Sequence, residues 1–516
     1  MTVDRQPVYR LAPRRTGTAL LGLAVPQVIL LAAGAAAVVL IPATTRSGAG
    51  AVTGLVVAAA CAAVAFCPVG GQPLYGALPV LLRYAARRAV GRAGWSAPLP
   101  LLTHPAGTGA PAIRSRPAAA PACLAELELV SVPRPDWAGV GRTLAPVGLV
   151  RDRRRGGLTV VVPLRGGGFG LLDPDGQHRA LAGWAQLLSQ FAREASPVTR
   201  LGWSLWSAPA VSTEHLDWLA ATITPGAAAA EDYLRLVTDA QPPCYRHDLR
   251  VWLTVEPGRA GHQDLPQAAL AAAEALAGRC ADAGLVPAGP LSPLDLVETL
   301  RVQADPTAAA TVTRIRRGLS RRAGLTAAGD AGVHPVHALP LAVAADWDAV
   351  RVDGCWHRVF WVCQWPAGEL DPQWFTPLLL PPAGVRTVAV VCEPVSARVS
   401  RRRITAESVS VDSQLQLRDR HAFRVPVPLQ RAQADLDQRE AELHAGYPEY
   451  RYLALVAVTA STRDELDAAS AALLDQAAQC GIVELRPLHG RHDAAWACTL
   501  PVGRVPDQLL LDRAGR

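Results

Sequence analysis

Histidine and cysteine side chains come close together at three places where metal binding or nucleophilic catalysis would be chemically feasible. His334 and His337 form an H-x-x-H pair, but no cysteine follows at the spacing of a zinc site. Cys355 and His357 would share one face of a strand, yet a cysteine nucleophile also needs an oriented base and an oxyanion hole. The H-x-x-H-D run at 489–493 is typical of a polar loop. We therefore expect no metal site and no catalytic residue.

Phosphate-binding chemistry has equally little support. The run Gly166–Gly170 is glycine-rich, but a phosphate loop leads into a helix N-terminus, and Leu171–Gly176 fits a further strand and turn. The chain contains no lysine, so all 51 basic residues are arginine. This excludes the catalytic lysines of P-loop ATPases, protein kinases and pyridoxal-phosphate enzymes. We expect a non-enzymatic protein that binds no cofactor.

Length and composition limit the class of protein and the number of domains. The chain has 516 residues, of which 50% are hydrophobic and 18% charged, which excludes a disordered protein and favours membrane segments. At about 100–200 residues per domain, this length corresponds to about three domain-sized units. The ten cysteines form no C-x-x-C pair, which is typical of free thiols in a reducing compartment.

Two uncharged segments near the N-terminus predict a transmembrane hairpin. No charged residue occurs in Gly17–Thr45, and Leu20–Ile41 alone is long enough to cross a hydrocarbon core of about 30 Å. A polar link then leads into a second uncharged run, Ala49–Val69. A cleaved signal peptide has a shorter apolar core and no second span, so it fits this pattern poorly.

Arginines flank the hairpin on one side of the membrane. Those flanking residues are Arg14 and Arg15 before it, and Arg83, Arg87, Arg88 and Arg92 after it. Only Arg46 lies between the spans, so the positive-inside rule places both termini and the main body in the cytoplasm, under the plasma membrane. The segment Leu74–Arg92 is either a basic interfacial helix on anionic lipid or the ordinary positive flank of a span.

The remaining sequence divides into an α+β body. We predict the following units: membrane anchor 1–95, Pro/Ala/Gly-rich linker 96–122, first α+β module 123–305, connector 306–354, and second α+β module 355–516 with a projecting insertion at 396–445. Trp252–Val255, an Ala-rich helix and Cys280–Leu285 are mirrored by Ala454–Thr459, a second such helix and Gln479–Ile482. This faint repeat favours two related α/β modules, ferredoxin-like or split βαβ.

Local patterns predict further elements within these modules. Val147–Arg151 and Leu158–Val162 fit a β-hairpin. Asp371 opens a predicted helix that continues to Leu380, and Asp464–Cys480 is a predicted helix with Ser461 as a plausible N-cap. The small-residue segment Ala494–Leu500 fits a closing strand.

Two groups of residues are candidates for interaction. The insertion carries Arg401, Arg402 and Arg403 and ends in the polar helix Leu429–His444, which is either a partner-docking arm or a solvated helix. The second group consists of tryptophans, namely Trp356, Trp361, Trp365 and Trp374. These rings either pack in the sheet or stack on nucleic-acid bases.

The organisation resembles secretion and conjugation components. The ending Asp493–Gly503, which closes in Leu-Pro-x-Gly, resembles the N-terminal, non-ATPase domain of conjugative type IV secretion ATPases. The hairpin resembles the PrgI-like membrane proteins that are fused to, or encoded beside, such ATPases. Asp173–Arg200, Trp365–Leu379 and Cys392–Val395 are similar to stretches in a group of actinobacterial membrane proteins linked to conjugative elements. The type VII secretion component EccE shares the same plan.

This resemblance implies a non-catalytic structural subunit of a type IV-like or type VII-like machine, held in the membrane beside other subunits. Such a subunit would dock a separate ATPase at the cytoplasmic face as part of a hetero-oligomer. The alternative is a membrane-tethered nucleic-acid-binding module, which the net charge of +7 and the arginine clusters permit.

Overall fold

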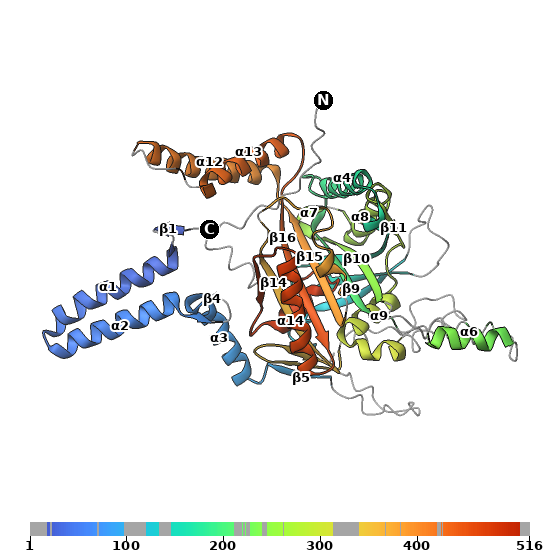
Figure 1. The fold of residues 1–516 in the computed structure, drawn as a ribbon, viewed down its shortest axis with the longest axis horizontal. Helices are drawn as coiled ribbons and strands as arrows, with labels where there is room; N and C mark the ends of the chain where they lie inside the picture. Colours follow the sequence, from blue (N-terminus) through green and yellow to red (C-terminus); the bar gives the residue numbers. More distant parts are fainter. Residues whose placement is uncertain are drawn as a thin grey trace.

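The fold is described from a computed structural model of the chain. It describes residues 18–97, 120–133, 146–210, 228–239, 245–312 and 340–505, with short gaps at 21–22, 70–71, 262, 367, 382, 421–424 and 426, and the isolated positions 219 and 222. A mixed α/β body with a large antiparallel sheet is confirmed, as is a pair of long apolar helices near the N-terminus (Figure 1).

The first half of the body opens with three sheet strands and ends with a helix. Its elements are β6 (Leu127–Val132), β7 (Val147–Asp152), β8 (Gly157–Gly166), the 3-10 turn η1 (Phe169–Leu171), α4 (Pro174–Phe191), β9 (Val198–Pro209), α6 (Ala228–Asp239), β10 (Tyr245–Val255), α7 (Pro257–Ala260), α8 (Leu265–Ala277), η2 (Ala281–Ala283), β11 (Leu285–Pro287), α9 (Pro293–Ala304) and η3 (Pro306–Ala308).

The second half has a similar order of strands and helices. Its elements are β12 (Ala342–Ala345), β13 (Val350–Val352), β14 (Cys355–Gln364), α11 (Thr376–Leu379), β15 (Val385–Pro394), α12 (Ala397–Arg420), α13 (Val427–His444), β16 (Tyr450–Ala460), α14 (Arg463–Gln479), β17 (Glu484–Pro487) and α15 (His492–Thr499). The sheet strands of this half begin at Ala342, which lies inside the range 306–354 that was predicted to be a connector.

One 13-stranded sheet joins the two halves. Its main path runs β5-β12-β13-β14-β16-β15-β9-β10-β8-β7-β6, where β5 is Gly94–Ser96, and β11 and β17 pair with β8 and β14. The order is symmetric about the β15–β9 pair. Moving outward from this pair, the first half contributes β9, β10 and β8, and the second half contributes β15, β16 and β14. The register between β9 and β15 is regular from Arg386↔Ser207 to Cys392↔Leu201.

Helices cover both faces of the sheet. On one face, α4 and α8 pack on the first half, and α11 and α14 pack on the second. The opposite face holds a core that runs through both halves under α9 and α15, with Trp252 and Trp496 among its fully buried side chains. Because both faces are covered, the central strands have near-continuous apolar sequences such as that of β8.

The two halves also exchange their ends. Gly503, which follows α15, lies against the hydrogen-bonded side chains of Thr159 and Thr254 in the first half. Conversely, the carbonyl oxygen of Ala304, at the end of α9, lies 2.9 Å from Nε2 of His357 in the second half. Each half therefore closes part of the other's core.

The N-terminal helices form a close antiparallel pair. Helix α1 (Val25–Thr45) and helix α2 (Gly48–Phe66) are both long and apolar enough to cross a membrane. Gly34 and Gly54 allow the backbones to approach, since a methyl group on Gly54 would lie 3.0 Å from the carbonyl oxygen of Ala37. Short strands accompany them: β1 (Thr18–Leu20) with β2 (Leu23–Ala24), and β3 (Pro68–Val69) with β4 (Gln72–Pro73). Figure 1 shows this pair extending away from the body.

Several sequence-based element predictions are wrong. Ala494–Leu500 is not a strand but belongs largely to helix α15, which is buried on nearly every side and so has no amphipathic pattern. Gly166–Gly170 leads through η1 into α4, whose N-cap Asp173 accepts a hydrogen bond from the Gly176 amide. The helix expected from Asp371 is only the short α11.

The N-cap of α14 is shifted by one residue from the predicted position. The side chain of Thr462, not Ser461, accepts a hydrogen bond from the Glu465 amide, and Glu465 in turn accepts one from the Thr462 amide. This reciprocal arrangement is a capping box. The predicted β7–β8 hairpin is confirmed.

Candidate functional site

The basic helix after the second apolar helix is docked on the body. Helix α3 (Leu74–Ala89) places the Arg87 guanidinium on the carboxylate of Asp493, whose side chain is only 5% exposed. The interaction raises the pKa of Arg87, with hydrogen bonding to Asp493 as the largest cause. One turn earlier, Tyr84 meets the ring of Trp347 edge-on, with centroids 5.4 Å apart. We call these four residues the membrane junction.

Two histidines extend the junction into the core. The ring of His489 stacks on Trp347 at 5.7 Å, and the buried His492 accepts a hydrogen bond at Nδ1 from the Val359 amide. Burial lowers the pKa of His492 well below its usual value, and desolvation also lowers that of His489. The first residues of the H-x-x-H-D run, His489 and Gly490, form a turn, whereas His492 and Asp493 are the buried start of α15. The expectation of a polar loop is therefore wrong for the second half of the run.

The other flanking arginines have different positions. Arg83, Arg88 and Arg92 are exposed, and the Arg88 guanidinium donates to the Tyr84 hydroxyl at 3.2 Å. Arg14 and Arg15 lie outside the described residues. Of the flanking arginines that the structure describes, Arg87 thus holds the helix on the body, and the other three are exposed.

The insertion forms a helical hairpin that we call the arm, α12 with α13. It leaves the body on the side toward the N-terminal helices in Figure 1, whereas α6 leaves on the other side. Its small core contains Ile404, Val411 and Leu436. Arg439 secures its base with hydrogen bonds of 2.8 Å to Glu407 and to Glu449.

Charged and apolar side chains remain exposed on the arm. Arg401 and Arg402 are exposed and Arg403 is half-buried. Val409 is 62% exposed and Leu417 60%, although both are large apolar side chains. The arm thus combines a small core of its own with an exposed surface that is both charged and apolar.

The four candidate tryptophans do not form one surface. Trp361 is 7% exposed and belongs to the core beneath α9 and α15. Trp356 is half-buried, with the Arg463 guanidinium over its ring at 4.3 Å. Trp365 and Trp374 meet edge-on at 6.0 Å in an aromatic cluster beside Phe375. Their main contacts are within the body, as expected for sheet packing.

Cys355 and His357 have surroundings that do not suit nucleophilic chemistry. Nδ1 of the buried His357 lies 2.9 Å from the Thr459 hydroxyl, and its Nε2 contacts the Ala304 carbonyl, so neither nitrogen faces the thiol. Burial lowers the pKa of His357 to about 4. Burial and the neighbouring Asp305 raise the pKa of Cys355 to about 12. The thiol remains protonated at neutral pH and is a poor nucleophile.

Metal-ligating side chains do not gather in the part of the chain that the structure describes, where no group of three or more His, Cys, Asp and Glu could hold an ion. His334 and His337 lie outside it. The phosphate-loop candidate at Gly166–Gly170 ends in a turn whose Leu171 is 93% exposed.

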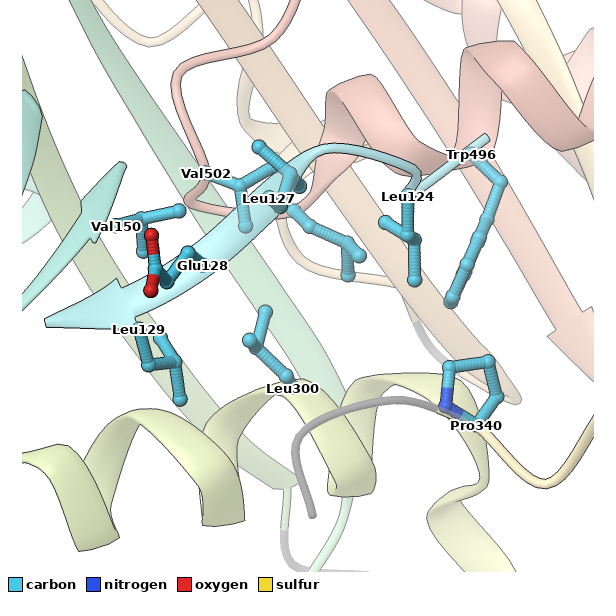
Figure 2. Close-up of a pocket in the computed structure, with 10 residues that line it drawn as sticks. Leu124, Leu127, Glu128, Leu129, Val150, Leu300, Pro340, Trp496 and Val502 are labelled. Atoms are coloured by element: carbon cyan, nitrogen blue, oxygen red, sulfur yellow. The ribbon is translucent and has the colours of Figure 1, made fainter. Parts of the chain in front are cut away.

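An apolar pocket lies between the first strand of the body and the helices of the continuous core. Figure 2 shows Leu124, Leu127 and Trp496 on one side of it and Leu300 and Pro340 on the other. Its volume is about 30 Å³, room for only one or two waters by the usual criterion of about 15 Å³ for each. Its single carboxylate, Glu128, already pairs with Arg153 at 3.0 Å. The pocket is too small for an organic ligand.

Comparison with models of known protein families and with curated protein sequences finds no match. The membrane junction is therefore defined by geometry alone. Its central ion pair joins residues 406 positions apart, so no local sequence signal could have identified Asp493 as the partner of Arg87.

Proposed function

We propose that this protein is a non-catalytic, membrane-anchored structural subunit of a secretion or conjugative DNA-transfer machine, either type IV-like or type VII-like. In this proposal α1 and α2 span the plasma membrane, and the body lies on the cytoplasmic side. A separate ATPase and other membrane subunits dock on that body.

The observation that carries the proposal is the arrangement of the arm and the membrane junction. The arm leaves the sheet with a minimal core of its own and exposed arginine and apolar side chains. The junction fixes α3 to the body through a largely buried ion pair and an aromatic contact. A rigid connection to the membrane together with a projecting arm suits a subunit that positions a partner.

We further propose that the body consists of two ferredoxin-like modules. Each module has the order strand–helix–strand–strand–helix–strand: β8-α4-β9-β10-α8-β11 and β14-α11-β15-β16-α14-β17. In each, the sheet order places the first strand between the third and the fourth. The α6 segment and the arm then occupy the same connection in the two modules, between the second and third strands.

The decisive experiment purifies the tagged full-length protein from its own host in a mild detergent and identifies co-purifying proteins by mass spectrometry. The test variant replaces Ser400–Ala445 with a short Gly/Ser linker. A point variant, Arg401→Glu with Arg402→Glu, changes only the exposed arm charge. Because the arm contributes little core, we expect both variants to remain membrane-bound and folded.

Recovery of a P-loop ATPase with the wild type and its loss from both variants would support the proposal, and the type of ATPase would distinguish the two systems. Unchanged recovery with the variants would contradict docking through the arm. If the wild type brings down only DNA that is released at high salt, the nucleic-acid-binding alternative is favoured.

A further inference from the structure

A second cavity, unlike the apolar pocket, has arginine at four of its ten lining positions. It has a volume of about 150 Å³ and lies where the β7–β8 turn, β9, α15 and the segment after α15 meet. Arg154, Arg155, Arg200 and Arg504 line it, with Asp152 as the single carboxylate among the lining residues that the structure describes. The volume is about ten times the minimum of roughly 15 Å³ that holds one water, so a polyatomic ion fits.

The most informative wall residue is Arg200, on β9. Its side chain is only 3% exposed, and one end of its guanidinium donates to Glu256 at 2.5 Å. Its Nε is buried and has no hydrogen-bond partner in the described part of the chain. A buried donor without a partner is costly, and the cost is greater on a charged group. Arg200 therefore brings a buried guanidinium to the cavity wall, with Glu256 paired to one end of it.

The groups around Arg200 carry both signs of charge. Burial, the largest cause, and the nearby positive charge of Arg155 lower the pKa of Arg200, whereas Glu256, Glu393 and Asp152 raise it. Asp152 is partly committed, because it accepts a hydrogen bond of 3.0 Å from the Arg154 amide. Arg504 is held at the rim by donating to the carbonyl oxygens of Cys123 and Ala125. Among the described lining residues, four guanidinium groups thus accompany one carboxylate, and Glu256 offsets the charge of Arg200 from outside this set.

We infer that this cavity is a binding site for a phosphate-bearing anion, either a small soluble phosphate or the phosphate of a lipid headgroup. Guanidinium groups bind phosphate oxygens in a bidentate manner, which neutral ligands or single-point anions do not exploit. The lipid source is sterically reasonable, because Ala494 of the cavity wall directly follows Asp493 of the membrane junction. This site is separate from the arm and does not depend on the proposed function.

The test uses the full-length protein in a neutral detergent. Inorganic pyrophosphate is titrated by calorimetry, and nanodiscs of phosphatidylglycerol or phosphatidylcholine provide the lipid source. The test variant is Arg154→Gln with Arg155→Gln, since both residues are exposed on a turn, where substitutions usually change stability little. The matched control is Arg153→Gln on the same turn, whose side chain is 66% exposed and pairs with Glu128 outside the cavity.

Charge-assisted hydrogen bonds contribute on the order of 1.5–3 kcal/mol. Their loss predicts a 10- to 100-fold lower affinity in the double variant and no change in the control. Saturable pyrophosphate binding with this pattern supports a soluble phosphate ligand. The same pattern seen only with phosphatidylglycerol nanodiscs supports a lipid headgroup. No binding in either form, or equal weakening by Arg153→Gln, would overturn the inference.

Discussion

Replacing Gly503 by alanine tests whether the exchanged ends hold the two halves together. Gly503 has φ +70°, a left-handed conformation that costs an alanine about 1–2 kcal/mol. A methyl group there would lie 2.3 Å from Oγ1 of Thr159 and 2.5 Å from Oγ1 of Thr254. Overpacking of this kind costs about 1–3 kcal/mol more. We therefore expect Gly503→Ala to lower the free energy of unfolding by about 2–5 kcal/mol.

The matched control is Gly284→Ala. Gly284 has nearly the same backbone angle, φ +68°, but a methyl group there would meet nothing within 4 Å. The control therefore carries only the backbone cost of about 1–2 kcal/mol. At about 2 °C per kcal/mol for a body of this size, thermal unfolding followed by tryptophan fluorescence should fall by about 4–10 °C for the first variant and about 2–4 °C for the second. Equal shifts would refute the reasoning that the end of α15 packs tightly on the first half.

Three further variants test other parts of the structure. Arg87→Ala leaves a buried carboxylate without its partner and should lower the free energy of unfolding by about 1–3 kcal/mol, whereas Arg88→Ala should change it by less than about 0.5 kcal/mol; comparable losses would argue against the junction. Thr462→Ala removes the capping box of α14 and should cost about 1 kcal/mol, measured by urea unfolding, with Ser461→Ala as a near-neutral control. The folded pKa of His357, about 4, lies below its unfolded value of about 6.5, so the unfolded state binds more protons and stability falls as the pH drops from about 6.5 to 4. Over this pH range the free energy of unfolding of His357→Gln should therefore fall by about 3 kcal/mol less than that of the wild type. Parallel pH profiles of the two proteins would contradict a neutral buried histidine.

Much of the fold follows from local sequence patterns. The β7–β8 hairpin, the central strands and the two apolar helices were predictable, because alternation, uncharged length and turn residues act over a few positions. Helix α15 was not, because its small residues are buried on almost all sides and resemble a strand. The approach of Arg87 to Asp493 and the convergence of arginines on the second cavity depend on tertiary packing. No spacing along the chain encodes these contacts.

Because β9 pairs with β15, each half of the body covers an edge strand of the other half. From Arg386 to Cys392, β15 occupies the hydrogen-bonding groups of β9 that would otherwise form an open sheet edge. Exposed edges of this length recruit other strands and promote aggregation. A fragment ending before β12 would therefore expose the unpaired edge of β9 and self-associate through it. Cutting the chain between the halves would produce a dimerising or insoluble fragment, so truncated versions are poor substitutes for the intact protein.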